Sequence, residues 1–256
     1  MMGLFALLTA SCTHPAVAIR DPSTAAAAEP ETPPTARSVP PDPRVGAVFL
    51  GGDSLHACSA GVLDSANGDL ILTAAHCLSD GTDATFVPGF NNDAAPDDYW
   101  HVDAVYLDPR WVRSQDPMAD FAIARVSRAA GGTVEARAGG GLKLVAAPAP
   151  GSVVSVTGYA MGVGGGPIGC RVPTGRPRQG FPALPCAALV DGVSGAPWIE
   201  GSTVSGLIGG LDGGGCQDQS DSYSPPFDDA ITALQKRAEA GGPADSAPVA
   251  FADGCQ

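Results

Sequence analysis

Short apolar runs separated by glycine and proline restrict the fold of this 256-residue sequence more than any other feature. The chain contains 34 Gly and 24 Pro, residues that interrupt helices and strands and favour turns. Apolar runs at 45–50, 58–63 and 70–72 follow this pattern, and Asn67-Gly68 between the last two is a strong hairpin signal. The pattern predicts many short strands, and therefore a β-barrel or a β-sandwich.

Further strand candidates continue this spacing along the chain. They are residues 100–107, 121–126, 153–159 and 204–208. Only residues 228–240 have strong helix signals: prolines before them, acidic residues in the first turn, basic residues near the end and glycines after it. The glycines of 138–141 indicate a hinge between two β halves, 44–138 and 142–227, and those of 162–166 indicate a flexible loop.

The charge balance excludes some classes of partner. With 27 acidic and 14 basic residues, the formal charge of −13 provides no basic surface for nucleic acid and no attraction to anionic membranes. Solubility is the simplest explanation of this acidity. Beyond the N-terminus, no stretch reaches the roughly 18 apolar residues of a membrane span.

The N-terminus predicts export of the chain. Residues 2–10 are apolar but too short to span a bilayer, and 16–18, Ala-Val-Ala, fit the small residues before a signal-peptidase site. This predicts a signal peptide over 1–18. The alternative is a lipoprotein signal, since residues 8–12 loosely match one, and Cys12 would then be lipidated and become the new N-terminus.

Two further segments lie outside the predicted core. Residues 19–43 are rich in Pro and Ala and are expected to form a flexible or extended linker or a short pro-segment, which composition does not distinguish. Residues 241–256 follow the helix and are expected to form a loose tail unless Cys255 fixes them.

The cysteines predict disulfides. Without Cys12, six of the seven remain, and an even number in an exported chain indicates up to three bridges among 15 connectivities. Metal binding is disfavoured because the sequence has no Cys-x-x-Cys pair and no His pair near the cysteines. The six are Cys58, Cys77, Cys170, Cys186, Cys216 and Cys255.

A His, an Asp and a Ser occur in an order typical of nucleophilic catalysis. His76 follows a strand within 73–77, Thr-Ala-Ala-His-Cys; Asp120 opens another strand; and Ser194 lies within 192–197, Gly-Val-Ser-Gly-Ala-Pro. A Ser hydroxyl is a weak nucleophile that needs a nearby base, and His can take and return its proton. We therefore assign Ser194 as nucleophile, His76 as general base and acid, and Asp120 as the group that orients His76.

Other residues compete for these roles. Asp116 is the main rival for the orienting acid, because it lies in the loop before the same strand. His56 and His101 have no motif around them, and surface or structural roles are expected for both.

These motifs resemble those of the chymotrypsin-like (trypsin-fold) serine proteases, especially the secreted bacterial branch. Residues 73–77 match the family's His motif letter for letter, and 120–124 resemble its Asp-Ile-Ala-Leu motif. Residues 192–197 resemble Gly-Asp-Ser-Gly-Gly-Pro with two departures, Val193 and Ala196. The resemblance covers about residues 44–240, which are expected to form the protease domain.

The resemblance implies an all-β fold of two packed antiparallel six-stranded β-barrels with a C-terminal helix, and an active site in the cleft between the barrels. The N–H groups of Gly192 and Ser194 are expected to form the oxyanion hole. The family has a bridge that corresponds to Cys58–Cys77, and the predicted hairpin brings these two residues together. Two further bridges are expected: Cys170–Cys186 closes a 15-residue loop, and Cys216–Cys255 follows by elimination only.

The two departures affect what the resemblance implies. Val193 replaces the Asp that in many family members pairs with a newly cut N-terminal amine, so activation by such an insertion is not expected. Ala196 replaces a Gly, and its methyl group is expected to crowd the packing behind the nucleophile.

By resemblance, the substrate pocket is expected in two segments, the residues just before the nucleophile and the strand end at 209–211. The expected pocket residues are Ala188, Asp191, Gly209, Gly210 and Leu211. Ala188 falls where trypsin-type enzymes carry their specificity-setting Asp, so small or apolar substrate side chains are favoured over Arg and Lys. Asp191 and Asp212 are the alternative, since they would place negative charge near the pocket.

The function predicted from the sequence is that of a secreted serine endopeptidase that works through an acyl-enzyme. The alternatives are a catalytically weak or inactive binding module on the same fold, and an esterase-like hydrolase with the same triad. Protein or peptide substrates are expected, without cofactor, metal or nucleic acid. The chain is expected to be an extracellular monomer, attached to the membrane only if Cys12 is lipidated.

Overall fold

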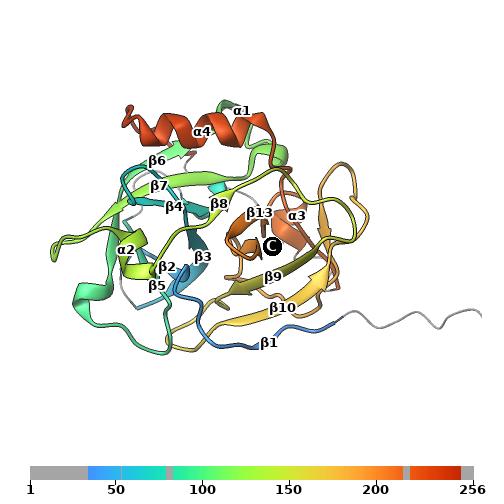
Figure 1. Cartoon of the computed structure of the whole chain (residues 1–256), viewed down its shortest axis with the longest axis horizontal. Coiled ribbons are helices and arrows are strands. Elements are labelled where there is room, and N and C mark those ends of the chain that lie inside the picture. The colour runs from blue at the N-terminus through green and yellow to red at the C-terminus, as the bar shows by residue number, and fades with distance from the viewer. Residues whose placement is uncertain (1–33, 53, 79–82, 216–219, 249–256) are drawn as a thin grey trace, which may run out of the picture. The chain divides into compact units, whose positions relative to one another are not determined.

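The computed structural model describes residues 34–52, 54–78, 83–215 and 220–248. Six strands of the first half close into a barrel in the order β2-β3-β4-β7-β6-β5, with all neighbours antiparallel (Figure 1). They are β2 (Val45–Leu50), β3 (His56–Val62), β4 (Leu70–Thr73), β5 (Ala84–Pro88), β6 (Trp100–Leu107) and β7 (Ala122–Ser127). Every side chain of β4 is buried, and Phe49, Phe86 and Trp100 fill the same core.

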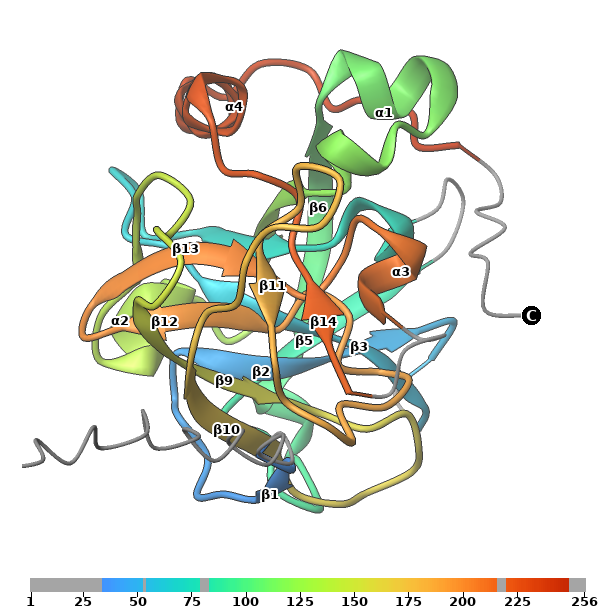
Figure 2. The same cartoon turned by 90° about the vertical axis from the view of Figure 1, so that its right-hand side faces the viewer.

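The second half forms a six-stranded sheet in the order β1-β10-β9-β12-β13-β8, and a two-stranded sheet of β11 and β14 (Figure 2). The strands are β1 (Arg37–Ser38), β8 (Lys143–Leu144), β9 (Val153–Gly158), β10 (Ile168–Pro173), β11 (Ala183–Leu184), β12 (Pro197–Glu200), β13 (Thr203–Leu207) and β14 (Ser222–Tyr223). With the first barrel, this gives the predicted double-barrel fold. One pair departs from the antiparallel prediction, because β8 runs parallel to β13 as the chain leaves the first half.

The predicted C-terminal helix is present as α4 (Asp229–Glu239). Asp228 caps it by accepting a hydrogen bond from the N–H of Ala230 at 2.8 Å. The helix lies across β6 and β7 (Figure 1), where the Arg125 guanidinium donates to the carbonyl of Ala238 at 2.6 Å. In the described residues, no helix is long and apolar enough to cross a membrane.

Several short helical segments were not predicted. The segment after β6 shows why: Asp108-Pro109 does end the strand, but it also starts α1, because Asp108 accepts from the N–H of Arg110 and Pro109 suits the first helical position. The short segments are α1 (Pro109–Ser114), α2 (Val134–Ala138), α3 (Asp212–Gly215), and the 3₁₀ turns η1 (Ala75–Cys77), η2 (Pro96–Asp98) and η3 (Pro117–Ala119).

The two segments predicted to be a hinge and a flexible loop are both hydrogen-bonded to the first barrel. Beside the glycines of 138–141, the Leu142 N–H donates to Val62, and a Cβ added at Gly141 would lie 2.3 Å from a backbone nitrogen. In the loop 162–166, Gly162 and His56 exchange two backbone hydrogen bonds of 3.1 Å. Gly141 thus permits close backbone approach, while Gly139, Gly140, Gly164 and Gly165 supply positive φ angles.

The described part of the predicted linker, residues 34–43, is also attached to the domain. Residues of β1 pair with β10, as Figure 2 shows. The Ala36 N–H donates to Ala187, and the Ala187 N–H donates to Pro34, both at 2.8 Å. An extended segment without a core of its own is ordered here because its backbone groups find partners along an existing sheet.

Removing residues 34–40 is predicted to destabilise the domain. The segment's hydrogen bonds stabilise the domain, and the conformational entropy lost in ordering the segment offsets part of that gain. The net loss in the free energy of unfolding is about 1–2 kcal/mol. A chain beginning at residue 41 should therefore melt about 2–8 °C below one beginning at residue 33. Thermal unfolding by circular dichroism compares the two, and equal melting temperatures would contradict the stabilising role of this segment.

Candidate active site

The imidazole of His76 is held by Asp120. His76 lies in the 3₁₀ turn η1 that follows β4, and its side chain is largely buried. Its Nδ1 lies 2.8 Å from Oδ2 of Asp120, and its backbone N–H donates to Oδ1 at 3.0 Å. Because a carboxylate only accepts hydrogen bonds, Nδ1 carries the proton and Nε2 is left as the basic nitrogen.

The carboxylate of Asp120 is fully buried, at the end of the 3₁₀ turn η3 and two residues before β7. Besides the two bonds from His76, its Oδ2 accepts the backbone N–H of Gly210 at 2.8 Å. Burial is the largest single influence and would raise the pKa of Asp120. The charge of His76 and the hydrogen bonds from His76 and Gly210 together outweigh it, so the pKa is lowered and the group stays ionised.

Asp116, the rival orienting acid, has another role. Its side chain accepts the N–H of Met118 at 3.0 Å and caps η3. The structure thus places Asp120, rather than Asp116, against His76.

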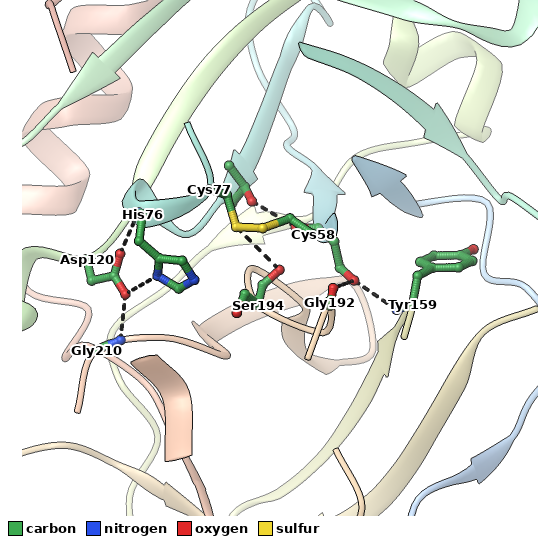
Figure 3. Close-up of a disulfide and its surroundings, with 10 residues drawn as sticks. Cys58, His76, Cys77, Asp120, Tyr159, Gly192, Ser194 and Gly210 are labelled. Carbon is green, nitrogen blue, oxygen red and sulfur yellow. Dashed lines mark hydrogen bonds and ion pairs between the residues drawn. A yellow bond between two sulfur atoms is a disulfide. The ribbon is translucent and has the colours of Figure 1, made fainter. Parts of the chain in front are cut away.

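Ser194 lies in a tight turn between two glycines with left-handed backbone angles, Gly192 (φ 93°) and Gly195 (φ 83°). A Cβ added at Gly195 would meet the Ser59 carbonyl oxygen at 2.2 Å, so this turn requires glycine. Figure 3 shows the Ser194 hydroxyl on the side of the His76 ring that carries Nε2. The structure therefore brings the three predicted residues together in one site.

The peptide between Asp191 and Gly192 has a fixed orientation. The carbonyl of Asp191 accepts the N–H of Met161 at 2.7 Å. In a trans peptide the N–H points away from the carbonyl, so the Gly192 N–H is directed away from Met161. No cis peptide bond occurs among the described residues.

The comparison with known proteins decides the family. Residues 58–209, more than half of the chain, match the model of the trypsin-like peptidase domain. The chain belongs to the trypsin-like peptidase family. No curated protein sequence matches it significantly.

Solved structures agree with this assignment at the level of the fold. The protease Anisep from Arthrobacter nicotinovorans is similar with a TM-score of 0.67 and 23% identity, over 80% of this chain and 100% of that one. The thermostable serine protease AL20 from an extremophilic microorganism is similar with a TM-score of 0.64 and 21% identity, over 78% of this chain and 99% of that one. Human heparin binding protein is similar with a TM-score of 0.60 and 14% identity, over 83% of this chain and 99% of that one.

Both departures from the trypsin-like nucleophile motif are accommodated by packing. Val193 is 3% exposed and Ala196 is fully buried, and both belong to the apolar core of the second half. The Ala196 methyl faces Gly158, where an added Cβ would lie 2.9 Å from it. The crowding expected from Ala196 is therefore relieved by a glycine on the neighbouring strand.

The expected pocket residues lie in two separate segments of the chain. Ala188 has a left-handed backbone (φ 62°), and Asp191 is exposed just before the nucleophile turn. Gly209 donates its N–H to the Tyr223 carbonyl, and Leu211 packs against a small separate apolar cluster. Gly210 instead binds Asp120, so its amide supports the His76 pair, a contact that the sequence did not predict.

Two of the three expected disulfide pairs are present. Cys58 and Cys77 are joined beside His76 (Figure 3), with their Cα atoms 6.1 Å apart. Cys170 and Cys186 are also joined. The remaining expected pair, Cys216–Cys255, and Cys12 lie outside the described residues.

The one group of potential metal ligands found in the described part of the chain is Cys58, His76 and Cys77, whose ligand atoms lie within 4.8 Å of one another. Both sulfurs belong to the disulfide and offer no thiolate to a metal.

His56, for which a surface or structural role was expected, is buried, and its Nε2 lies 2.8 Å from the Gly164 carbonyl oxygen.

Asp120→Asn is predicted to lower stability in a pH-dependent way. A lowered pKa in the folded state means that the carboxylate stabilises the fold above its ordinary pKa of about 4, and that this contribution is lost as the pH falls further. The melting-temperature gap between wild type and Asp120→Asn should therefore be present at pH 7 and shrink towards pH 3.

Asp116→Asn is the matched control, because Asn keeps the oxygen that accepts from Met118. It should change the melting temperature little at any pH. If the difference in melting temperature between wild type and Asp120→Asn grew as the pH fell, the lowered pKa of Asp120 would be contradicted.

Proposed function

We propose that this chain is a serine endopeptidase in which Ser194, His76 and Asp120 form the catalytic triad. The observation that carries this proposal is the pairing of His76 Nδ1 with the buried Asp120 carboxylate at 2.8 Å. It leaves Nε2 facing the Ser194 hydroxyl, in a member of the trypsin-like peptidase family.

The first chemical step is attack of the Ser194 Oγ on the carbonyl carbon of the scissile bond. His76 Nε2 takes the hydroxyl proton as the new C–O bond forms. The imidazole then carries a positive charge, which the ionised Asp120 stabilises without taking the proton itself. The charge of His76 and the hydrogen bonds from His76 and Gly210 lower the pKa of Asp120 despite its burial, so Asp120 keeps its charge during this step.

The tetrahedral intermediate carries a negative charge on the former carbonyl oxygen. The N–H groups of Gly192 and Ser194 donate to this oxygen, and one such donor is typically worth about 10²–10³ in rate. His76 then returns the proton to the leaving nitrogen, the C–N bond breaks and an acyl-enzyme remains on Ser194. Water, activated by His76, hydrolyses this ester.

The substrate is an extended polypeptide. It lies beside residues 209–211 as an additional strand, which gives affinity through backbone hydrogen bonds. Ala188 and the glycines favour small or apolar side chains in the pocket over Arg or Lys. The catalytic domain covers about residues 44–240, and the chain acts as a monomer without cofactor, metal or nucleic acid.

The chain is exported and acts outside the cell. Two disulfides support an oxidising compartment, since such bonds rarely persist in the cytosol. Export would proceed through cleavage after residue 18 or through lipidation of Cys12, and Cys216–Cys255 would complete the set of bridges. Val193 is buried in the core and has no carboxylate to pair with a new N-terminal amine, so activation by such an insertion is not expected.

A fluorophosphonate probe tests the proposal. It reacts with an activated serine, so the wild type should be labelled, while Ser194→Ala should not. His76→Ala should label at least about 10³-fold more slowly, because the hydroxyl loses its base. Intact-mass spectrometry measures the labelling, and circular dichroism verifies that each variant is folded.

Peptide and ester substrates separate the remaining functions. Cleavage of a peptide library that requires Ser194 identifies an endopeptidase, and turnover of esters alone identifies an esterase. A folded wild type that neither labels nor cleaves would favour a binding module. One similar structure is named for heparin binding, which makes a binding module the alternative to separate from a hydrolase.

A further inference from the structure

The hydroxyl group of Ser59 contacts the oxyanion-hole turn directly. Ser59 lies on β3 beside Cys58 and is fully buried. Its Oγ donates to the carbonyl of Gly192 at 3.0 Å and accepts the backbone N–H of Tyr159 at 2.9 Å. One side chain of the first barrel thus joins two backbone segments of the second half.

The backbone of Ser59 reaches the nucleophile as well. Its N–H donates to the Ser194 carbonyl at 2.8 Å, and its own carbonyl accepts the hydroxyl of Thr73 at 2.8 Å. Thr73 precedes the turn that carries His76. Ser59 therefore lies between the strand that leads to the base and the turn that carries the nucleophile.

Gly192 needs such support because glycine is the residue with the freest backbone. Gly192 has a left-handed conformation (φ 93°). A bulkier residue cannot take its place, because an added Cβ would lie 2.1 Å from the Met161 nitrogen. The peptide before Gly192 is held by Met161, and the peptide after it by the Ser59 hydroxyl. The Gly192–Val193 peptide joins the two peptides whose N–H groups, those of Gly192 and Ser194, the oxyanion requires, so its rotation would redirect both of them.

We propose that the Ser59 hydroxyl is a positioning group that holds the Gly192–Val193 peptide, and with it the oxyanion hole, in the orientation needed for catalysis. This inference rests on the proposed peptidase function. Ser59 touches neither substrate nor reacting atoms in this role, and it acts through Gly192.

The chemistry of the contact explains why a hydroxyl is suited to this position. A hydroxyl donates one hydrogen bond and accepts others, so it can satisfy the Gly192 carbonyl and the Tyr159 N–H together. Alanine would leave both groups without this partner, and buried polar groups favour conformations that restore a hydrogen bond. The Gly192–Val193 peptide would then sample other orientations, and the neighbouring N–H groups of Gly192 and Ser194 would no longer be held towards the oxyanion.

The test compares Ser59→Ala with Ser224→Ala. Ser224 is an equally buried serine whose hydroxyl also links two backbone groups, since it accepts from Leu207 at 3.0 Å and donates to Pro225 at 2.7 Å. This control loses the same atoms and a similar pair of hydrogen bonds, but none that reaches Gly192. Fluorophosphonate labelling, turnover of a small peptide ester, melting temperature and hydrogen–deuterium exchange are measured for both variants.

For Ser59→Ala, the labelling rate and kcat should fall about 10–100-fold, less than the loss of a complete oxyanion donor. KM should change by less than about threefold, because the hydroxyl acts in the transition state and not in binding. The pH midpoint of labelling should stay that of wild type, because the His76–Asp120 pair is intact. Exchange in peptides spanning 189–195 should rise in Ser59→Ala only.

Two results would overturn the inference: equal labelling rates of wild type and Ser59→Ala, or equal losses in Ser59→Ala and Ser224→Ala that follow melting temperature alone. Failure of the proposed peptidase function can be distinguished from failure of this inference, because the fluorophosphonate would then not label the wild type either. In that case hydrogen exchange still decides the inference, and unchanged exchange across 189–195 in Ser59→Ala would reject it.

Discussion

The carboxylate of Asp120 is fully buried, and its hydrogen bonds join parts of the chain that are far apart in sequence. It accepts two N–H groups from His76 in the first barrel and one from Gly210, just beyond β13 in the second half. A buried charge is strongly unfavourable unless it is paired and hydrogen-bonded. The fold must therefore hold both halves against Asp120, and the orientation of His76 depends on this contact.

The rest of the site is attached to rigid elements around that contact. β4 leads into the His76 turn and pairs with β7, the strand that follows Asp120, within the closed barrel. The Cys58–Cys77 disulfide connects the turn to β3, and Ser59 on the same strand binds the nucleophile turn. Catalytic side chains need positions fixed to a fraction of an ångström, which neighbouring strands and a covalent bridge provide better than free loops.

Much of this arrangement could be predicted from the sequence. Alternating apolar runs and turn residues predicted the strands, and the motifs around His76 and Ser194 indicated which loops would meet. The contacts that could not be predicted are mainly made by the backbone, such as the Gly210 N–H on Asp120, because an amide is present at almost every position. Ser59 has no motif of its own, and its role depends on a register that only the folded barrels define.

Other differences had signals that admitted two interpretations. Asp108-Pro109 is both a strand terminator and a helix start, and here it is both. The glycines of 138–141 and 162–166 suggested a hinge and a flexible loop, but glycine also serves close approach, as at Gly141, and positive φ angles, as at Gly164 and Gly165. At Ala196, one residue departed from the family motif while a glycine elsewhere, Gly158, supplied the space, a pairing visible only in three dimensions.

In the proposed mechanism, Ser194 forms an ester with the acyl group of its substrate. Rapid acid quenching during turnover of an activated peptide ester, followed by mass spectrometry of proteolytic fragments, measures this intermediate directly. A transient acyl group is expected on the fragment containing Ser194 in wild type, and none in Ser194→Ala. Turnover without any acylated fragment, or with the acyl group on another residue, would contradict this mechanism.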